Sequence, residues 1–216
     1  MKKIFIAVDT TDLKKAKKII AQSQTKKIKI GYKFGLEFMN SKRGRHFVSK
    51  LRNKIIFVDL KLNDTVNTML SAVKALKDLK INYLTVHISS GLAALKAVKK
   101  ISRCKIVGVS TLTSLNNKDL KTIGYNRSIK NLVSHQAKLA NRVGLDAVVC
   151  SPYEVNIVRK VFKKEIITPG VQIGKRNYDQ KRSMEAKKVS SDWIVIGRSV
   201  TRGNIKNNIQ KLIKSI

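Results

Sequence analysis

The chain is poor in cysteine, proline and acidic residues. Its 216 residues include two cysteines and two prolines, and 13 acidic side chains stand against 46 basic ones. Cys104 and Cys150 are far apart and lack metal-ligand spacing, so neither a disulfide framework nor a cysteine metal site is expected. No uncharged stretch approaches the ~18 residues of a membrane span, and Asp9 interrupts the first apolar run too early for a secretory signal. We therefore expect a soluble protein of the cytoplasm.

Linker sequences are also missing. No segment is rich in Ser, Gly and Pro, and no stretch longer than a short loop loses its apolar pattern. The length suits one sizeable hydrophobic core. The sequence therefore predicts a single domain over residues 1–216.

Aromatic residues are scarce, and this weakens the function that the high positive charge first suggests. A formal net charge of +33 first suggests binding to nucleic acid through phosphate neutralisation. However, only 6% of residues are aromatic, and the lysines are spread along the whole chain without a dominant cluster. Stacking platforms and a localised basic patch are therefore lacking, and nucleic-acid binding is the weaker hypothesis.

What the chain does contain is a regular alternation of short apolar runs with amphipathic, lysine-rich stretches. The runs are rich in Ile and Val and nearly continuous in apolarity, as strands of a parallel sheet covered on both faces require. There are eight of them, at 4–9, 28–33, 55–61, 83–87, 105–110, 146–150, 165–170 and 193–197.

Helical patterns lie between these runs and after the last one. Clear examples cover 12–22, 68–79, 91–101, 131–143 and 204–216, and Asp12 is a suitable N-cap for the first. Eight strand–helix units predict an α/β fold of the (β/α)8 TIM-barrel type. An open doubly wound sheet is the alternative, but it would normally carry a glycine-rich phosphate turn after the first strand, where this chain has VDTTD.

Polar side chains occur where the predicted strands end. In a (β/α)8 barrel the active site lies at the carboxyl ends of the strands, so these side chains should converge on one mouth. The stretch DLKLND at 59–64 is the most unusual, because alternation would place Asp59 and Lys61 on the same face of a buried strand. The polar residues at strand ends are Asp9, Lys33, Asp59, Lys61, His87, Ser110 and Arg198.

Several short motifs, in this order, resemble those of the orotidine 5'-phosphate decarboxylase family. DLKLND with the following TVNT resembles the family's D-x-K-x-x-D signature, and KFGLEF at 33–38 its strand-two lysine motif. TLTS at 111–114 resembles the loop beside the pyrimidine. Three motifs resemble the family's phosphate-binding end, namely TPG at 168–170, DQ at 179–180 and IGRS at 196–199.

The resemblance implies decarboxylation of orotidine 5'-monophosphate to UMP, without a cofactor or metal, in pyrimidine biosynthesis. It places Asp59 beside the substrate carboxylate and makes Lys61 the proton donor to pyrimidine C6. Lys33 would contact Asp59 and the ribose, and Asp9 a ribose hydroxyl. Asp64 and Thr68 would reach into a neighbouring subunit, which implies a homodimer with shared sites. The remaining implied contacts are Ser114 to the pyrimidine and Gln180 and Arg198 to the phosphate. The residues themselves add that the turn beginning at Gly197 offers backbone N–H groups to a phosphate, and that the polar stretch 171–180 could form a loop that closes over it.

The chain departs from the family pattern at uncharged positions, including Asn63, Thr65, Val66 and Gln172. Related Mg2+-dependent sugar-phosphate lyases, of the hexulose-phosphate synthase and keto-gulonate-phosphate decarboxylase types, share D-x-K-x-x-D on the same barrel. They would call for a metal-binding carboxylate on the second strand, where this chain has Lys33. The decarboxylase without a metal is therefore the favoured hypothesis.

Overall fold

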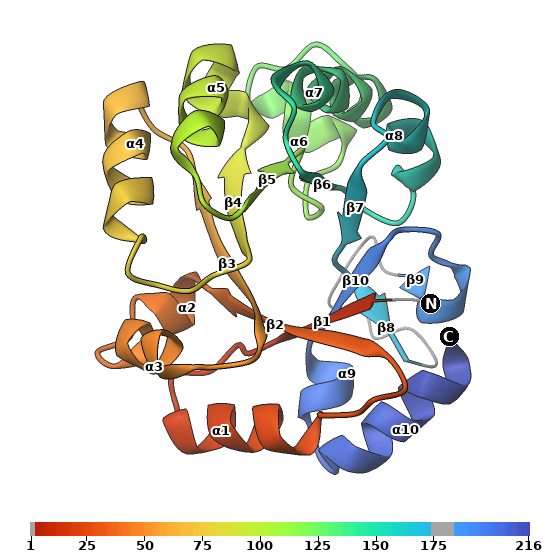
Figure 1. Ribbon diagram of the computed structural model, residues 1–216. Coiled ribbons are helices and arrows are strands. Elements are labelled where there is room, and N and C mark those ends of the chain that lie inside the picture. The colour runs from red at the N-terminus through yellow and green to blue at the C-terminus, as the bar shows by residue number, and fades with distance from the viewer. Residues whose placement is uncertain (1–2, 174–183) are drawn as a thin grey trace.

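The computed structural model describes residues 3–173 and 184–216 and shows a closed barrel of eight parallel strands surrounded by helices (Figure 1). The barrel strands are β1 (Lys3–Ala7), β2 (Lys29–Gly35), β3 (Ile55–Leu62), β4 (Tyr83–His87), β5 (Lys105–Val109), β6 (Ala147–Val149), β7 (Glu165–Thr168) and β10 (Trp193–Ile196). Each pairs with the next along the chain, and β1 pairs with β10 to close the ring. The predicted (β/α)8 barrel is confirmed, and its closure excludes the open sheet.

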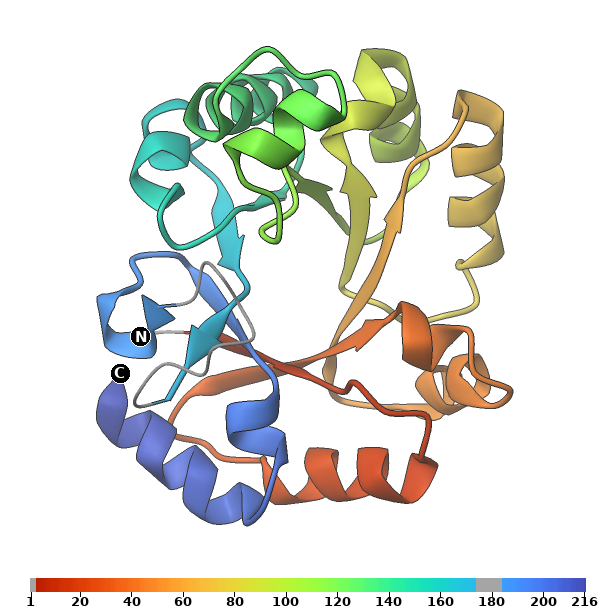
Figure 2. The same ribbon diagram turned by 180° about the vertical axis from the view of Figure 1, so that it is seen from behind.

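Helices follow the strands and cover the outside of the barrel, as both face views show (Figures 1 and 2). They are α1 (Leu13–Gln22), α2 (Leu36–Met39), α3 (Gly44–Lys50), α4 (Val66–Ala75), α5 (Gly91–Ile101), α6 (Asn117–Thr122), α7 (Ile129–Val143), α8 (Val155–Val161), α9 (Arg198–Thr201) and α10 (Ile205–Ser215), with 3-10 turns at Ile88–Ser90 and Ala186–Lys188. The predicted N-cap of α1 is confirmed, because Asp12 Oδ1 accepts from the Lys14 N–H at 2.7 Å. No helix in the described ranges is long and apolar enough to cross a membrane.

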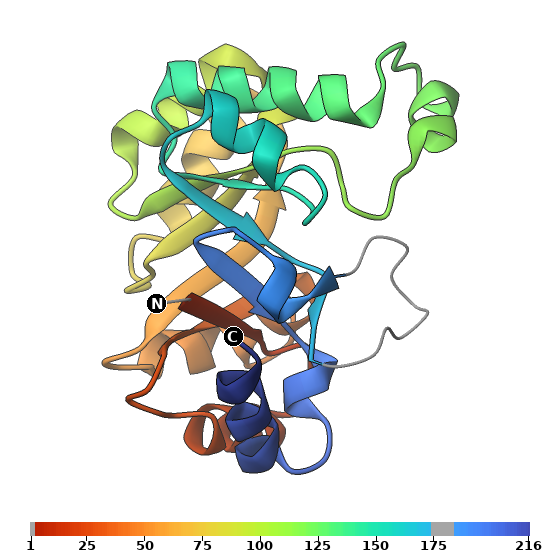
Figure 3. The ribbon, with the colours of Figure 1, turned by 90° about the vertical axis from the view of Figure 1, so that its right-hand side faces the viewer.

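Two further segments lie at the carboxyl ends of the strands. The short strands β8 (Val171–Gln172) and β9 (Met184–Glu185) pair with each other outside the barrel. The connection between β5 and α7, which carries α6, projects beyond the strand ends (Figure 3). Most of the predicted phosphate-closing loop, 171–180, lies outside the described residues.

The interior of the barrel is filled by an aromatic layer. Phe5 and Trp193 stack with ring centroids 4.0 Å apart, while Phe57 and Tyr83 pack against Phe5 at 4.8 and 5.2 Å. Gly31 makes room for this layer, because a Cβ there would lie 2.6 Å from the Phe5 ring. The barrel is therefore a packed core below the strand ends, and any pocket must lie above it.

A charged cluster closes the opposite end. Glu165 accepts hydrogen bonds from Lys3 at 3.0 Å, Lys105 at 2.8 Å, the Tyr83 hydroxyl at 2.9 Å and the Trp193 indole at 3.1 Å. Burial would raise the pKa of Glu165, but these four donors together lower it to about 2. Burial and the neighbouring Glu165 charge raise the pKa of Tyr83 to about 12. The cluster ties together strands that lie far apart in the sequence.

Candidate active site

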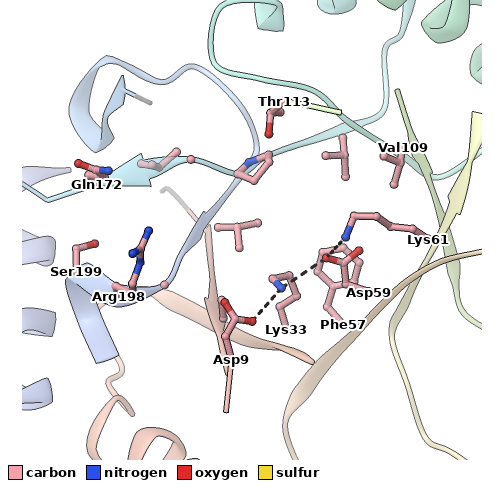
Figure 4. A pocket seen from close by; sticks show the side chains of 17 residues that line it. Asp9, Lys33, Phe57, Asp59, Lys61, Val109, Thr113, Gln172, Arg198 and Ser199 are labelled. Carbon is pink, nitrogen blue, oxygen red and sulfur yellow. Dashed lines mark hydrogen bonds and ion pairs between the residues drawn. The ribbon is translucent and has the colours of Figure 1, made fainter. Parts of the chain in front are cut away.

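A pocket of about 300 Å3 opens above the aromatic layer, at the carboxyl ends of the strands (Figure 4). Its wall includes six of the polar or glycine positions singled out in the sequence, namely Asp9, Lys33, Asp59, Lys61, Gly197 and Arg198. Apolar side chains from several strands, among them Phe57, Val109 and Val195, form much of the rest of the wall. The expected convergence of polar strand-end residues on one mouth is confirmed for five of the seven, all but His87 and Ser110.

Opposite charges alternate along one side of the pocket. The Lys33 ammonium lies 3.5 Å from Asp9 Oδ1 and 3.5 Å from Asp59 Oδ2, and the Lys61 ammonium lies 2.9 Å from the same Asp59 oxygen. The Asp59 side chain is 12% exposed and that of Lys33 13%, whereas Asp9 is largely exposed. Lys33 and Asp59 are therefore fixed ionic groups that are shielded from water, where charge interactions are stronger than at the surface.

Asp59 remains ionised in this environment. Burial by itself would raise the pKa of its carboxyl group, but the charges of Lys33 and Lys61 and the hydrogen bonds from Lys61 and Thr85 lower it. A negative carboxylate thus faces the pocket beside a lysine ammonium at neutral pH. This combination can repel an anionic group and deliver a proton within one small volume.

Lys61 takes an unusual backbone conformation. The sequence predicts a regular strand through this residue, but the pairing of β3 with β4 shifts between Val58 and Leu62, and Lys61 has a φ of 51°. This left-handed conformation is uncommon for a residue with a side chain. Asp59 and Lys61 are in direct contact, which confirms that they share one face. Regular strand alternation was expected between them, but the strand contains a bulge at this point.

Arg198 lies on the far side of the pocket from Lys61 (Figure 4). It begins the short helix α9, directly after Gly197, and the wall beside it includes Gly170 and Gln172. Gly170 has a φ of 75°, a conformation that favours glycine and lets the backbone turn closely around the pocket. A guanidinium on this side suits a phosphate or carboxylate group.

Three predicted contact residues, Asp64, Thr68 and Ser114, do not line this pocket. Asp64 is exposed and caps the neighbouring Thr65 N–H at 2.7 Å, and Thr68 is exposed and contacts Thr65. Ser114 is exposed, while Thr113 beside it is part of the wall. Gln180 lies outside the described residues.

Ser110 and His87, the other two polar strand-end residues, do not have the surroundings expected of catalytic groups. The Ser110 hydroxyl donates to the Val149 carbonyl at 2.7 Å and is therefore engaged by the barrel wall. His87 is half-buried, and its pKa is lowered by burial and by the Lys61 charge, although Asp59 acts in the opposite direction. This lowering of the pKa disfavours the protonated imidazole, which is the form that could deliver a proton.

Sequence reasoning missed Thr85 and Thr113. Thr85 is completely buried and hydrogen-bonds both to Asp59 and to the Lys61 backbone. Its signal was available, because alternation along YLTVH places Thr85 on the same inward face as Tyr83 and His87. Thr113 belongs to TLTS, which resembles the loop beside the pyrimidine, but the motif does not determine which of its side chains faces the pocket.

Comparisons with known proteins agree on one family. Residues 2–210 match the family model described as "Orotidine 5'-phosphate decarboxylase / HUMPS family". The curated orotidine 5'-phosphate decarboxylase of Wolbachia sp. subsp. Brugia malayi is 40% identical over 99% of this chain and 98% of its own length. That of Buchnera aphidicola subsp. Acyrthosiphon pisum (strain Tuc7) is 39% identical over 98% of this chain and 93% of its own.

Solved structures give the same result. The crystal structure of orotidine 5'-phosphate decarboxylase from Lactobacillus acidophilus superposes with a TM-score of 0.83 at 26% identity, covering 100% of this chain and 99% of that one. On the evidence of the barrel, the pocket and these full-length similarities, the chain belongs to the orotidine 5'-phosphate decarboxylase / HUMPS family.

Proposed function

We propose that this chain decarboxylates orotidine 5'-monophosphate to UMP and CO2 in pyrimidine biosynthesis, without a metal or organic cofactor. The observation that carries the proposal is the row Lys33–Asp59–Lys61 inside the pocket, with Arg198 on the opposite side. The substrate is anionic at both ends, with a carboxylate on the pyrimidine and a phosphate on the ribose. The positions of these charged groups therefore suit its two ends.

The difficult step is the loss of CO2 from a pyrimidine carbon that has no electron sink. The bond from C6 to the carboxylate carbon breaks, and the electron pair stays on C6 as a localised carbanion. Asp59 would raise the free energy of the bound carboxylate by repulsion, while Lys61 would stabilise the developing carbanion. Two unit charges ~4 Å apart interact by about 4 kcal/mol at an effective dielectric near 20, so charges fixed at these distances are large enough to matter.

Lys61 would then transfer an ammonium proton to C6, giving UMP, and regain a proton from solvent. Lys33 keeps Asp59 ionised and correctly placed, because its ammonium lies 3.5 Å from that carboxylate. Lys33 and Asp9 would also bind ribose hydroxyls. On the phosphate side we assign Arg198 and Gly197, together with Gln180, and we assign Ser114 to the pyrimidine.

We also propose a homodimer with shared sites, in which each subunit is a single domain of residues 1–216. Asp64 and Thr68 are exposed close after β3 and do not line their own subunit's pocket, which leaves them available to a neighbour. Exposed apolar side chains follow three strands at the same end of the barrel, namely Leu36, Leu112 and Tyr153. Covering this end with a second subunit would remove them from water.

The cytoplasm is the expected location. Cys150 is buried and Cys104 half-buried, and neither forms a disulfide. Burial, more than the effects of nearby groups, raises the pKa of the Cys104 thiol to about 11, so it is a poor nucleophile. Cysteines outside any disulfide suit a reducing compartment.

The ultraviolet absorbance of purified protein with orotidine 5'-monophosphate in excess EDTA tests the function directly. Turnover by the native chain, lost in a folded Lys61→Ala variant, is the expected result. Failure of the native chain to convert this substrate would overturn the proposal. Mg2+-dependent conversion of a sugar phosphate would then identify the other branch of the family, although Lys33 lies between Asp9 and Asp59 where a cation would need to sit.

A further inference from the structure

The bulge in β3 faces a single residue of β4. Val58 pairs with Leu84 and Leu62 pairs with Val86, so the three residues from Asp59 to Lys61 span a stretch in which β4 has only one residue, Thr85. The two residues of this bulge with charged side chains are those proposed to act on the substrate. The residue opposite them is therefore in a position to determine where both side chains point.

The Thr85 hydroxyl contacts both of these residues. Its Oγ1 accepts the Lys61 backbone N–H at 2.8 Å and donates its own proton to Asp59 Oδ1 at 3.0 Å. The direction of each bond follows from chemistry, because an N–H can only donate and an ionised carboxylate can only accept. Thr85 has no exposed surface, so water does not compete for either bond.

These two bonds complete the surroundings of the Asp59 carboxylate. Oδ1 is bound by Thr85 from β4, whereas Oδ2 faces Lys61 from β3 and Lys33 from β2. His87, further along β4, makes no hydrogen bond to Asp59, which accepts from Lys61 and Thr85. The Thr85 hydroxyl is therefore the only uncharged donor to Asp59 among the side chains in the described ranges, and it also holds the left-handed turn at Lys61.

We propose that Thr85 is a positioning residue that holds the Lys61 backbone and the Asp59 carboxylate in one fixed arrangement. The inference rests on the proposed decarboxylation, because it concerns the geometry of the proton donor and the carboxylate in that reaction. Thr85 does not line the pocket and acts through its two partners. A threonine suits this task because branching at Cβ restricts the side chain to few rotamers and so aims the hydroxyl.

The matched substitutions are Thr85→Val and Thr85→Ser. Valine keeps the shape and branching but removes both hydrogen bonds, whereas serine keeps the hydroxyl. We expect T85V to lower kcat about 10- to 100-fold, because a displacement near 1 Å of reacting groups can cost about 100-fold. The KM should change little, since neither Arg198 nor Asp9 contacts Thr85. T85S should retain kcat within about 3-fold, because positioning depends on the hydroxyl.

Ser23→Ala serves as the structural control. Ser23 is also fully buried, and its hydroxyl donates to the Ile19 carbonyl at 2.6 Å at the end of α1, away from the pocket. We expect S23A to lower the melting temperature while kcat stays unchanged. If T85V does not fold, Thr85→Ala provides the same comparison with T85S, because alanine also lacks the hydroxyl.

The pH dependence of kcat provides a second readout. Loss of a donor to the ionised carboxylate should raise the pKa of Asp59, so the acidic limb of the T85V profile should move to higher pH. Retention of kcat and of the acidic limb in a folded T85V or T85A variant would overturn the proposal. Equal loss in T85S and T85V would also overturn it, because the hydroxyl would then not be responsible. An inactive native chain would instead refute the proposed decarboxylation.

Discussion

The Lys61 ammonium donates a 2.9 Å hydrogen bond to Asp59 Oδ2, two residues earlier on the same strand. In a regular strand the two side chains would project in parallel from one face. Here the strand has a bulge and Lys61 has a left-handed backbone, and the two side chains converge. The two groups therefore form an ion pair at the pocket wall.

Removal of the Asp59 charge should reduce catalysis strongly. In Asp59→Asn the side chain keeps its shape but no longer repels the substrate carboxylate or pairs with Lys61. We expect kcat to fall at least about 100-fold, because electrostatic groups of this kind contribute about 100- to 1,000-fold. Steady-state kinetics measure this. Asp12→Asn, which keeps a good N-cap on α1, should leave kcat unchanged, and an active D59N would contradict the assigned role.

Arg198 should control substrate affinity more than turnover. A hydrogen bond to a charged group contributes about 1.5–3 kcal/mol, so Arg198→Ala should raise KM about 10- to 100-fold. The matched control is Arg202→Ala, which removes the same charge from an exposed position outside the pocket. An unchanged KM in R198A would remove this residue from the phosphate site.

Shared sites predict complementation between two inactive variants. Lys61→Ala and Asp64→Ala would each be inactive, but a mixed dimer would contain one site with both defects and one intact site. With free exchange of subunits, an equal mixture should recover roughly a quarter of the native activity. Sedimentation velocity on the native chain should show a dimer. No recovery in a mixture that demonstrably exchanges subunits would indicate that Asp64 acts within its own subunit or not at all.

Glu165 should make stability depend on acidic pH. Its pKa in the folded protein is about 2, below the ordinary value of 4.5, so its contribution is present in full above about pH 4.5 and is lost as the pH falls toward 2. Glu165→Gln should lower the free energy of unfolding at pH 7 by about 1–3 kcal/mol, because buried donors lose a charged acceptor. In E165Q, part of the decrease in the free energy of unfolding between pH 4.5 and pH 2 should also disappear.

Urea unfolding at several pH values measures this effect. Asp78→Asn is the control, because its partner Arg45 and Asp78 itself are exposed and such pairs contribute little. Identical pH profiles for E165Q and the native chain would show that the cluster does not stabilise the fold.

Much of the architecture followed from local pattern. The Ile- and Val-rich runs predicted all eight barrel strands with small differences at their ends, and Asp12 predicted the start of α1. Sequence reasoning located Asp9, Lys33, Asp59, Lys61 and Arg198 because each lies close to the carboxyl end of a strand, and parallel strands bring such ends together.

The chain's sequence by itself determined the alternating strands and helices, and with them the end of the barrel where the charged residues gather. Only the tertiary structure decided how those charges are held. The shift of β3 against β4, the capture of the Lys61 N–H by Thr85 and the place of Thr113 in the pocket wall all depend on contacts between distant segments. The same holds for Glu165, whose partners come from strands at both ends of the chain. A local pattern reports which face a residue occupies, whereas strand register and loop paths are set by packing across the whole barrel.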